Sequence, residues 1–245
     1  AANSETAIID TRAVARIEGP IQGSGTLFKL NQKIVVLTAW HVLKGVREGE
    51  EVDVVLVDGR IGSIDFKSIT RIGNVDMAIA DVSSIREIPD ILVATEPATI
   101  GTNARVFGYP IDSNGQLVSS SGIIHSNSNI GIDQGYQLIY SIETKPGMSG
   151  GPVIDDIGNI IGIHGRGELN QFQSEYKEKI VKTRLNNGVP ISYFISYLRG
   201  EDTSYIPQKP KSIDDLNSFC SNLFLLLLFS FLCTSRSCSA VCLSR

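Results

Sequence analysis

The chain has 245 residues, of which 42% are hydrophobic and 7% aromatic, and its formal charge is −4. This composition excludes collagen, a coiled coil and a wholly disordered chain. The mild acidity, with no basic stripe, gives no reason to expect a nucleic-acid partner. The length suits one large β domain or two smaller ones.

The cysteines are confined to the end of the chain. All four lie after residue 219, at Cys220, Cys233, Cys238 and Cys242. Residues 1–219 are therefore expected to fold without disulfides, and they contain neither a cysteine nucleophile nor an all-cysteine zinc site. No His-Glu-x-x-His motif or other metal-ligand spacing appears, so no metal and no cofactor are expected.

Short apolar or alternating segments, rich in β-branched residues and separated by turn residues, predict an all-β body. In chain order the expected strands are 25–30, 33–38, 51–57, 76–80, 104–107, 137–142, 152–154 and 159–163. Asn31-Gln32 and Asp58-Gly59 are expected hairpin connections. One helix is predicted over 189–198, because Ile191, Phe194, Ile195 and Leu198 repeat at helical spacing and Pro190 suits a first turn.

The composition changes after this helix. Residues 200–218 are polar and predict a linker, whereas 219–245 form a cysteine-containing tail with an apolar stretch at 219–233. Fifteen helical residues span only about 22 Å, short of a hydrocarbon core of about 30 Å. We interpret the stretch as a membrane anchor or interfacial segment, or as an extension foreign to the protein.

A glycine-rich serine turn is the most informative motif. Ser149 is flanked by Gly147, Gly150 and Gly151, a backbone that can hold a hydroxyl beside two N–H groups aimed at one point. A serine hydroxyl needs an adjacent base to become a nucleophile. His41 closes the apolar run 35–43 and is a candidate base, whereas His125 lies in a polar stretch and is interpreted as a surface residue.

Asp76 completes the candidate set. It begins an apolar segment, where an unpaired carboxylate would be costly to bury, so a hydrogen-bonded partner is expected. A turn or strand-cap aspartate is the alternative explanation.

The order His41, Asp76, Ser149 resembles that of the chymotrypsin/trypsin-like serine peptidases. Thr38-Ala-Trp-His41 is similar to the family's Thr-Ala-x-His block, Asp76-Met-Ala-Ile79 to its Asp-hydrophobic-Ala-hydrophobic strand, and Gly147-Met-Ser-Gly-Gly-Pro152 to its Gly-x-Ser-Gly-Gly-Pro signature. The resemblance runs from about residue 12 to 199.

The resemblance implies two six-stranded antiparallel β-barrels with a C-terminal helix and a site in the cleft between the barrels. The protease domain would be residues 1–199, with barrels at roughly 12–98 and 99–199. His41 would be the general base, Asp76 its orienting acid and Ser149 the nucleophile, and the N–H groups of Gly147 and Ser149 would form the oxyanion hole. The substrates would be peptides or proteins, and a monomer is expected.

Two further features refine the resemblance. Met148 stands where the vertebrate digestive enzymes have an aspartate that pairs with a newly cut N-terminus, so that form of activation is not expected. Together with the cysteine-free body, this favours the bacterial branch. A secreted, periplasmic or membrane-associated location is therefore predicted.

The residues of the substrate pocket are most similar to those of glutamyl endopeptidases. Thr144, five residues before Ser149, and His164, fifteen after it, match that group's pocket positions. With nearby Arg166 they could bind a carboxylate by charge-assisted hydrogen bonds. Glu143 occupies the position of the acid that selects Lys or Arg in trypsin-like enzymes, so a basic preference stays open, as does a small or apolar one.

Other classes of function fit the sequence less well. The HtrA group shares the serine block but carries a PDZ domain, for which the residues after Leu198 are too few. A non-catalytic binding module would usually lack one member of the triad, and none is missing here. Gly23-Ser-Gly25 and Gly165-Arg-Gly167 lack the spacing and context of nucleotide-binding loops.

Overall fold

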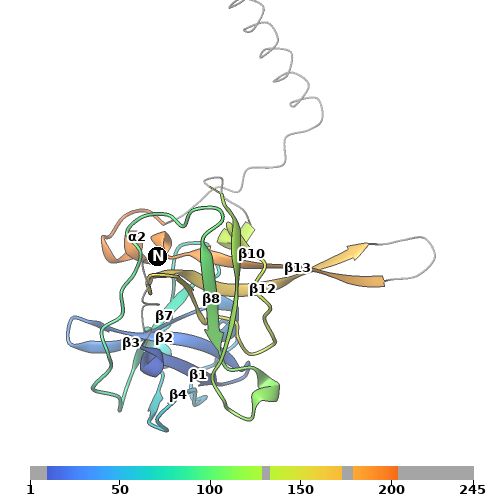
Figure 1. Cartoon of the computed structure of the whole chain (residues 1–245). Helices are drawn as coiled ribbons and strands as arrows, with labels where there is room; N and C mark the ends of the chain where they lie inside the picture. The colour runs from blue at the N-terminus through green and yellow to red at the C-terminus, as the bar shows by residue number, and fades with distance from the viewer. Residues whose placement is uncertain (1–9, 129–132, 173–178, 204–245) are drawn as a thin grey trace, which may run out of the picture. The chain divides into compact units, whose positions relative to one another are not determined.

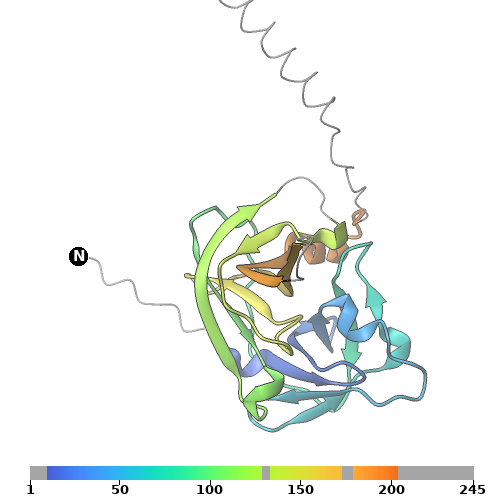
Figure 2. The ribbon, with the colours of Figure 1, turned by 90° about the vertical axis from the view of Figure 1, so that its right-hand side faces the viewer.

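The computed structural model describes residues 10–128, 133–172 and 179–203. These residues all belong to one compact unit, Ala1–Pro207. The second unit, Gln208–Arg245, is not among the described residues. The strands form two groups that lie side by side, one blue to cyan and the other green to orange (Figures 1 and 2).

The first group is an antiparallel seven-stranded sheet in the order β5-β4-β1-β2-β3-β7-β6. Its strands are β1 Val14–Glu18, β2 Gly23–Leu30, β3 Lys33–Thr38, β4 Asp53–Leu56, β5 Ile61–Ser63, β6 Thr70–Arg71 and β7 Ala78–Val82. The β2–β3 hairpin turns at Asn31 and Gln32, both with positive φ, as expected for a two-residue hairpin.

This sheet curls back on itself. Ile64, directly after β5, bridges Val82 in β7, and the Ser83 N–H donates to the Ser63 carbonyl at 2.9 Å. The sheet has seven strands rather than the expected six because Thr70–Arg71 adds the short strand β6 beside β7.

The second group is a closed barrel in the order β10-β13-β12-β11-β8-β9. Its strands are β8 Asn103–Gly108, β9 Val118–Asn127, β10 Leu138–Tyr140, β11 Pro152–Asp155, β12 Ile160–Phe172 and β13 Lys179–Pro190. The β12–β13 hairpin extends beyond the barrel (Figure 1). The all-β prediction is confirmed, with one closed six-stranded barrel and a second, curled sheet.

Alternating burial explains why these segments pair as they do. β7 alternates between buried and half-buried positions, and β4 does the same, so each strand turns one apolar face inward. Leu27, Val36 and Val54 are fully buried in one core, and Leu138 and Val153 in the other. Burying each such side chain contributes about 1.5–3 kcal/mol.

The helices are short. They are α1 Trp40–Leu43, α2 Ser192–Leu198 and the 3-10 turns η1 Thr11–Ala13, η2 Phe66–Ser68, η3 Ile111–Ser113 and η4 Asp133–Gly135. The predicted helix 189–198 begins too early, because Val189 and Pro190 pair with Ile163 and Gly162 in the sheet. Phe194 of α2 is buried and packs against Phe28, with ring centroids 5.1 Å apart.

The predicted linker and tail fall almost entirely outside the described residues, which end at 203. Among the residues that are described, none forms a helix long and apolar enough to cross a membrane. The interpretation of 219–233 as an anchor and the expected location of the protein therefore stay predictions.

Ser24 of β2 connects the two groups of strands. Its hydroxyl donates to the Gly147 carbonyl and accepts from the Tyr109 N–H, both at 2.8 Å. Its N–H donates to the Ser149 carbonyl at 2.7 Å, and its carbonyl accepts from the Thr38 hydroxyl at 2.7 Å. One fully buried residue thus holds the serine turn of the second half against the sheet of the first.

We predict that Ser24→Ala lowers the free energy of unfolding by about 2–4 kcal/mol, because it leaves the Gly147 carbonyl and the Tyr109 N–H buried without a partner. Urea denaturation of the full chain measures this. Thr26→Val is the matched control: Thr26 lies on the same strand, equally buried, and its hydroxyl has no hydrogen-bond partner among the described residues. Equal losses in both variants would contradict the connecting role of Ser24.

Candidate active site

His41 lies on α1, directly after β3 ends. Its Nδ1 is 2.7 Å from Asp76 Oδ2, and its backbone N–H donates to Asp76 Oδ1 at 2.8 Å. The Asp76 side chain is fully buried, whereas the imidazole is 28% exposed. The carboxylate therefore holds both the backbone and the ring of His41, and the ring stays partly exposed.

Asp76 is charged despite its burial. Burial raises the pKa of its carboxyl group, but the hydrogen bond and charge of His41 and a hydrogen bond from Tyr136 lower it by more, so the net pKa lies below the ordinary value. Asp76 precedes β7 in a bend rather than opening the strand, and its N–H donates to the Gln134 carbonyl at 2.7 Å. The expected hydrogen-bonded partner is therefore present.

Ser149 sits on a turn that only glycines can complete. Gly147 and Gly150 have φ values of +97° and +85°, and a Cβ on Gly150 would lie 2.1 Å from the Thr38 hydroxyl. The Ser149 hydroxyl donates to the Gly165 carbonyl at 3.0 Å. No hydrogen bond joins it to His41 among the described residues.

The two N–H groups of this turn are available. Among the described residues neither the Gly147 nor the Ser149 N–H has an acceptor. The Pro146 carbonyl accepts from the Ile111 N–H at 3.0 Å. Because the carbonyl and N–H of a trans peptide point in opposite directions, this bond turns the Gly147 N–H away from Ile111.

His164 lies beside the turn, on β12. Its carbonyl accepts from the Gly150 N–H at 2.7 Å, and its Nδ1 is 2.7 Å from the Tyr140 hydroxyl. Burial lowers the pKa of His164 to about 3 and raises that of Tyr140 well above its ordinary value. At neutral pH both are uncharged, so the pair is joined either by the Tyr140 hydroxyl donating to Nδ1 or by Nδ1–H donating to the Tyr140 oxygen.

The other predicted pocket residues are more open. Glu143 is exposed and Thr144 half-buried, and neither has a hydrogen bond or ion pair to His164 or Arg166 among the described residues. Arg166 is exposed, and its Cζ lies 4.5 Å from the centroid of the Tyr136 ring. The structure thus brings His164 next to Ser149 and leaves Arg166 stacked on an aromatic face.

Sequence reasoning missed Tyr136, Tyr140 and Ser24. Tyr136 donates to Asp76 Oδ2 at 2.6 Å from a segment 60 residues further along the chain. No local pattern marks these residues, because each acts through a contact distant in sequence. A buried carboxylate needs donors, which is a signal that one exists but does not say which residue supplies it.

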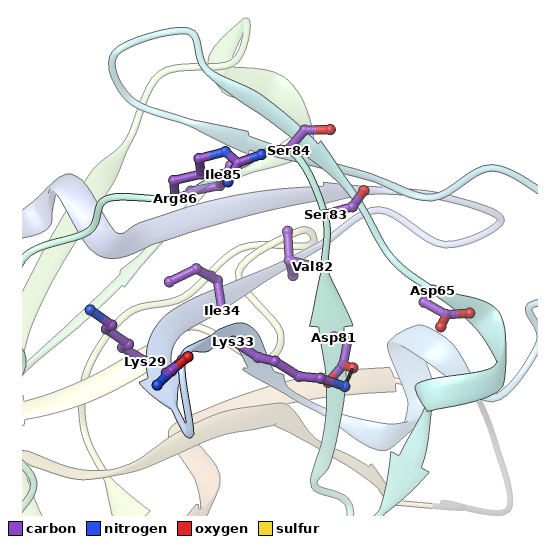
Figure 3. A pocket seen from close by; sticks show the side chains of 11 residues that line it. Lys29, Lys33, Ile34, Asp65, Asp81, Val82, Ser83, Ser84, Ile85 and Arg86 are labelled. Atoms are coloured by element: carbon purple, nitrogen blue, oxygen red, sulfur yellow. Dashed lines mark hydrogen bonds and ion pairs between the residues drawn. The ribbon is translucent and has the colours of Figure 1, made fainter.

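A hollow of about 810 Å³ lies on the first sheet, around the β2–β3 hairpin and the end of β7 (Figure 3). The Lys33 side chain reaches Asp81 across its floor, and Lys29 and Arg86 stand on its rim. No histidine or cysteine lines it, and neither Asp76 nor Ser149 does. Within the described residues there is also no cluster of three or more His, Cys, Asp or Glu that could hold a metal.

Comparison with known proteins agrees with this geometry. Residues 23–163 match the trypsin-like peptidase domain family, so the chain belongs to that family. The glutamyl endopeptidase of Staphylococcus epidermidis is 29% identical over 189 residues, which cover 70% of this chain and 64% of that protein. The glutamyl endopeptidase of Staphylococcus aureus is 31% identical over 120 residues, covering 45% and 32%. The chain therefore spans just under two thirds of the first of these relatives.

Solved structures have the same fold. The active form of the Rv3671c protease from M. tuberculosis superposes with a TM-score of 0.59 at 19% identity, covering 81% of this chain and 84% of that one. The serine endoprotease from Yersinia pestis gives 0.56 at 20% identity, covering 78% and 62%. All of these proteins are bacterial.

We predict that His164 makes folding acid-sensitive. Its pKa is about 3 when folded and 6.5 in the unfolded chain, so the unfolded chain binds the extra proton between these values and stability falls as the pH drops below 6.5. At pH 5 the loss is about 2 kcal/mol relative to pH 8. His164→Gln should lose about that much less than the parent in urea denaturation at the two pH values. The exposed His125→Gln should behave like the parent, and a parent-like drop in His164→Gln would contradict the prediction.

Proposed function

We propose that the protein is a serine endopeptidase that hydrolyses peptide bonds through an acyl-enzyme. Ser149 is the nucleophile, His41 the general base and Asp76 the acid that orients the imidazole. The N–H groups of Gly147 and Ser149 form the oxyanion hole. No metal or cofactor takes part.

In the first step the Ser149 Oγ attacks the scissile carbonyl carbon and its proton passes to His41 Nε2. The carbonyl oxygen becomes an oxyanion that accepts from the two turn N–H groups. His41 then protonates the leaving amine as the C–N bond breaks, which leaves an ester on Ser149. Water, deprotonated by His41, attacks this ester, and the proton returns to Ser149 as the acid product leaves.

The observation that carries the proposal is the pair of hydrogen bonds between Asp76 and His41. Two hydrogen bonds, to Nδ1 and to the backbone N–H, fix the ring, and a carboxylate at Nδ1 keeps the proton on that nitrogen. Nε2 is then the unprotonated atom of the neutral ring. A base with this orientation, beside a serine turn with two unpaired N–H groups, suits acyl transfer.

We predict that Ser149→Ala lowers kcat/KM of the full chain toward a mixed peptide library by at least about a thousandfold. Ser141→Ala, an exposed serine eight residues upstream, is the matched control and should cleave like the parent. A fluorophosphonate should label the parent and Ser141→Ala but not Ser149→Ala. An unlabelled, inactive parent would instead support a non-catalytic binding module.

For the side chain before the cut we propose an acidic preference, glutamate above all. A neutral His164 with its proton on Nε2 is a donor that does not need a counter-ion, and the Thr144 hydroxyl and the Arg166 guanidinium are further donors. The similarity to glutamyl endopeptidases supports the same choice. The competing preference for Lys or Arg rests on Glu143, which has no ion-pair partner among the described residues.

We predict that Thr144→Val lowers kcat/KM for cleavage after Glu about tenfold, because a hydrogen bond to a charged group contributes about 1.5–3 kcal/mol. Cleavage after an apolar residue should be unaffected. Glu143→Gln is the matched test of the alternative and should leave cleavage after Glu unchanged or faster. Loss of a dominant cleavage after Lys or Arg in Glu143→Gln would overturn the acidic preference.

A further inference from the structure

Tyr136 makes a contact with the buried acid that the sequence motifs do not contain. It follows η4 in the second half of the chain, is 4% exposed, and donates its hydroxyl to Asp76 Oδ2 at 2.6 Å. The turn before it also supports the acid, because the Gln134 carbonyl accepts the Asp76 N–H at 2.7 Å. One short segment therefore fixes both the backbone and the side chain of Asp76.

The direction of this hydrogen bond is determined by its surroundings. Burial, followed by the charge of Asp76 and the hydrogen bond to it, raises the pKa of the Tyr136 hydroxyl far above its ordinary value. The phenol is neutral wherever the protein is folded, and Asp76 is the charged acceptor. Tyr136 is thus a permanent donor to the carboxylate.

The hydroxyl shares one carboxylate oxygen with the imidazole. His41 Nδ1 and the Tyr136 hydroxyl both contact Oδ2, at 2.7 and 2.6 Å, while Oδ1 accepts the His41 backbone N–H. Three donors in fixed directions leave the carboxylate no rotational freedom. They also divide its negative charge, so part of the charge on Oδ2 is drawn toward the phenol rather than the imidazole.

The ring of Tyr136 is held in place as tightly as its hydroxyl. A Cβ on Gly165 would lie only 2.1 Å from the ring Cε1, so the ring fills the space that any other residue at 165 would need. The Arg166 guanidinium covers the ring face at 4.5 Å. The Gly165 carbonyl accepts the Ser149 hydroxyl, so the same piece of β12 contacts both the nucleophile and the tyrosine.

We propose that Tyr136 is a positioning residue of the triad, which orients Asp76 and limits the charge that the carboxylate presents to His41. This inference rests on the proposed serine-peptidase function. Tyr136 touches no reacting atom. It acts on Asp76, and Asp76 in turn sets the basicity of His41 Nε2 and the orientation of the ring.

The neighbouring charged groups do not replace this effect. Arg166 and Asp133 face the phenol with opposite charges. His164 faces His41 from β12 but is uncharged above pH 3, because burial lowers its pKa to about 3. Of the groups named here from the second half of the chain, the Tyr136 hydroxyl is the one with a hydrogen bond to Oδ2.

The test is Tyr136→Phe in the full chain, assayed for peptide cleavage across pH. We expect kcat to fall about tenfold with KM little changed, the equivalent of one hydrogen bond to a charged group. The midpoint of the acidic limb of the kcat/KM profile should rise by roughly 0.5–1 unit, because more charge on Oδ2 favours the imidazolium. Fluorophosphonate labelling of Ser149 should persist at a slower rate.

Tyr109→Phe is the matched control, because its buried hydroxyl donates to a backbone carbonyl, that of Val14, away from the triad. It should lose stability without moving the pH profile. If Tyr136→Phe does not fold, site-specific 3-fluorotyrosine at position 136 keeps the hydroxyl and makes it a stronger donor, which should shift the acidic limb downward.

Two outcomes separate this inference from the proposed function. An active parent, an inactive Ser149→Ala and a Tyr136→Phe with parental kcat and pH profile would overturn the positioning role and leave the peptidase intact. A parent that neither cleaves peptides nor reacts with fluorophosphonate would overturn both.

Discussion

The structure depends on one buried serine that joins its two halves. Ser24 belongs to the first sheet, yet three of its four hydrogen bonds go to the second half, to Gly147, Ser149 and Tyr109. Gly147 and Tyr109 are buried, so these hydrogen bonds exist only while the two halves are packed together. The serine turn therefore has a defined position relative to the first sheet only when β2 is packed against it. The packing of the two halves and the geometry of the candidate site thus depend on the same contacts.

The buried charge of Asp76 also requires the two halves to be packed together. A carboxylate with no exposed surface is tolerated only when donors surround it. The first half supplies the N–H and ring of His41, and the second half supplies the Tyr136 hydroxyl. Neither half satisfies the carboxylate alone. A site between the curled sheet and the closed barrel therefore lets donors from both halves surround the buried charge.

The sequence predicts those features of the protein that depend on residues close together in the chain. The alternating strands, the Asn31-Gln32 hairpin and the serine turn follow from short patterns, and so does the family to which the chain belongs. Strand β9 was missed because its serine-rich sequence, with exposed and half-buried positions, lacks the usual apolar alternation. The first residues of the expected helix joined β13 because pairing with β12 outweighs local spacing. Ser24, Tyr136 and Tyr140 could not be found, since the partners that give them their roles, Gly147, Asp76 and His164, lie 24 or more residues away.

The two histidines of the site illustrate how such distant partners decide chemistry. Asp76 can only accept a hydrogen bond, so at His41 it keeps the proton on Nδ1 and leaves Nε2 as a lone pair, which suits the proposed base. Tyr140 is kept protonated by burial, and the tautomer of His164 in which Nδ1 accepts from its hydroxyl carries the proton on Nε2, which suits the proposed donor to a substrate carboxylate. The Nε2 atom of a histidine is thus an acceptor or a donor according to whether the partner of Nδ1 accepts or donates a hydrogen bond. The motif names the histidines, but their roles are set by a carboxylate and a phenol contributed from elsewhere in the chain.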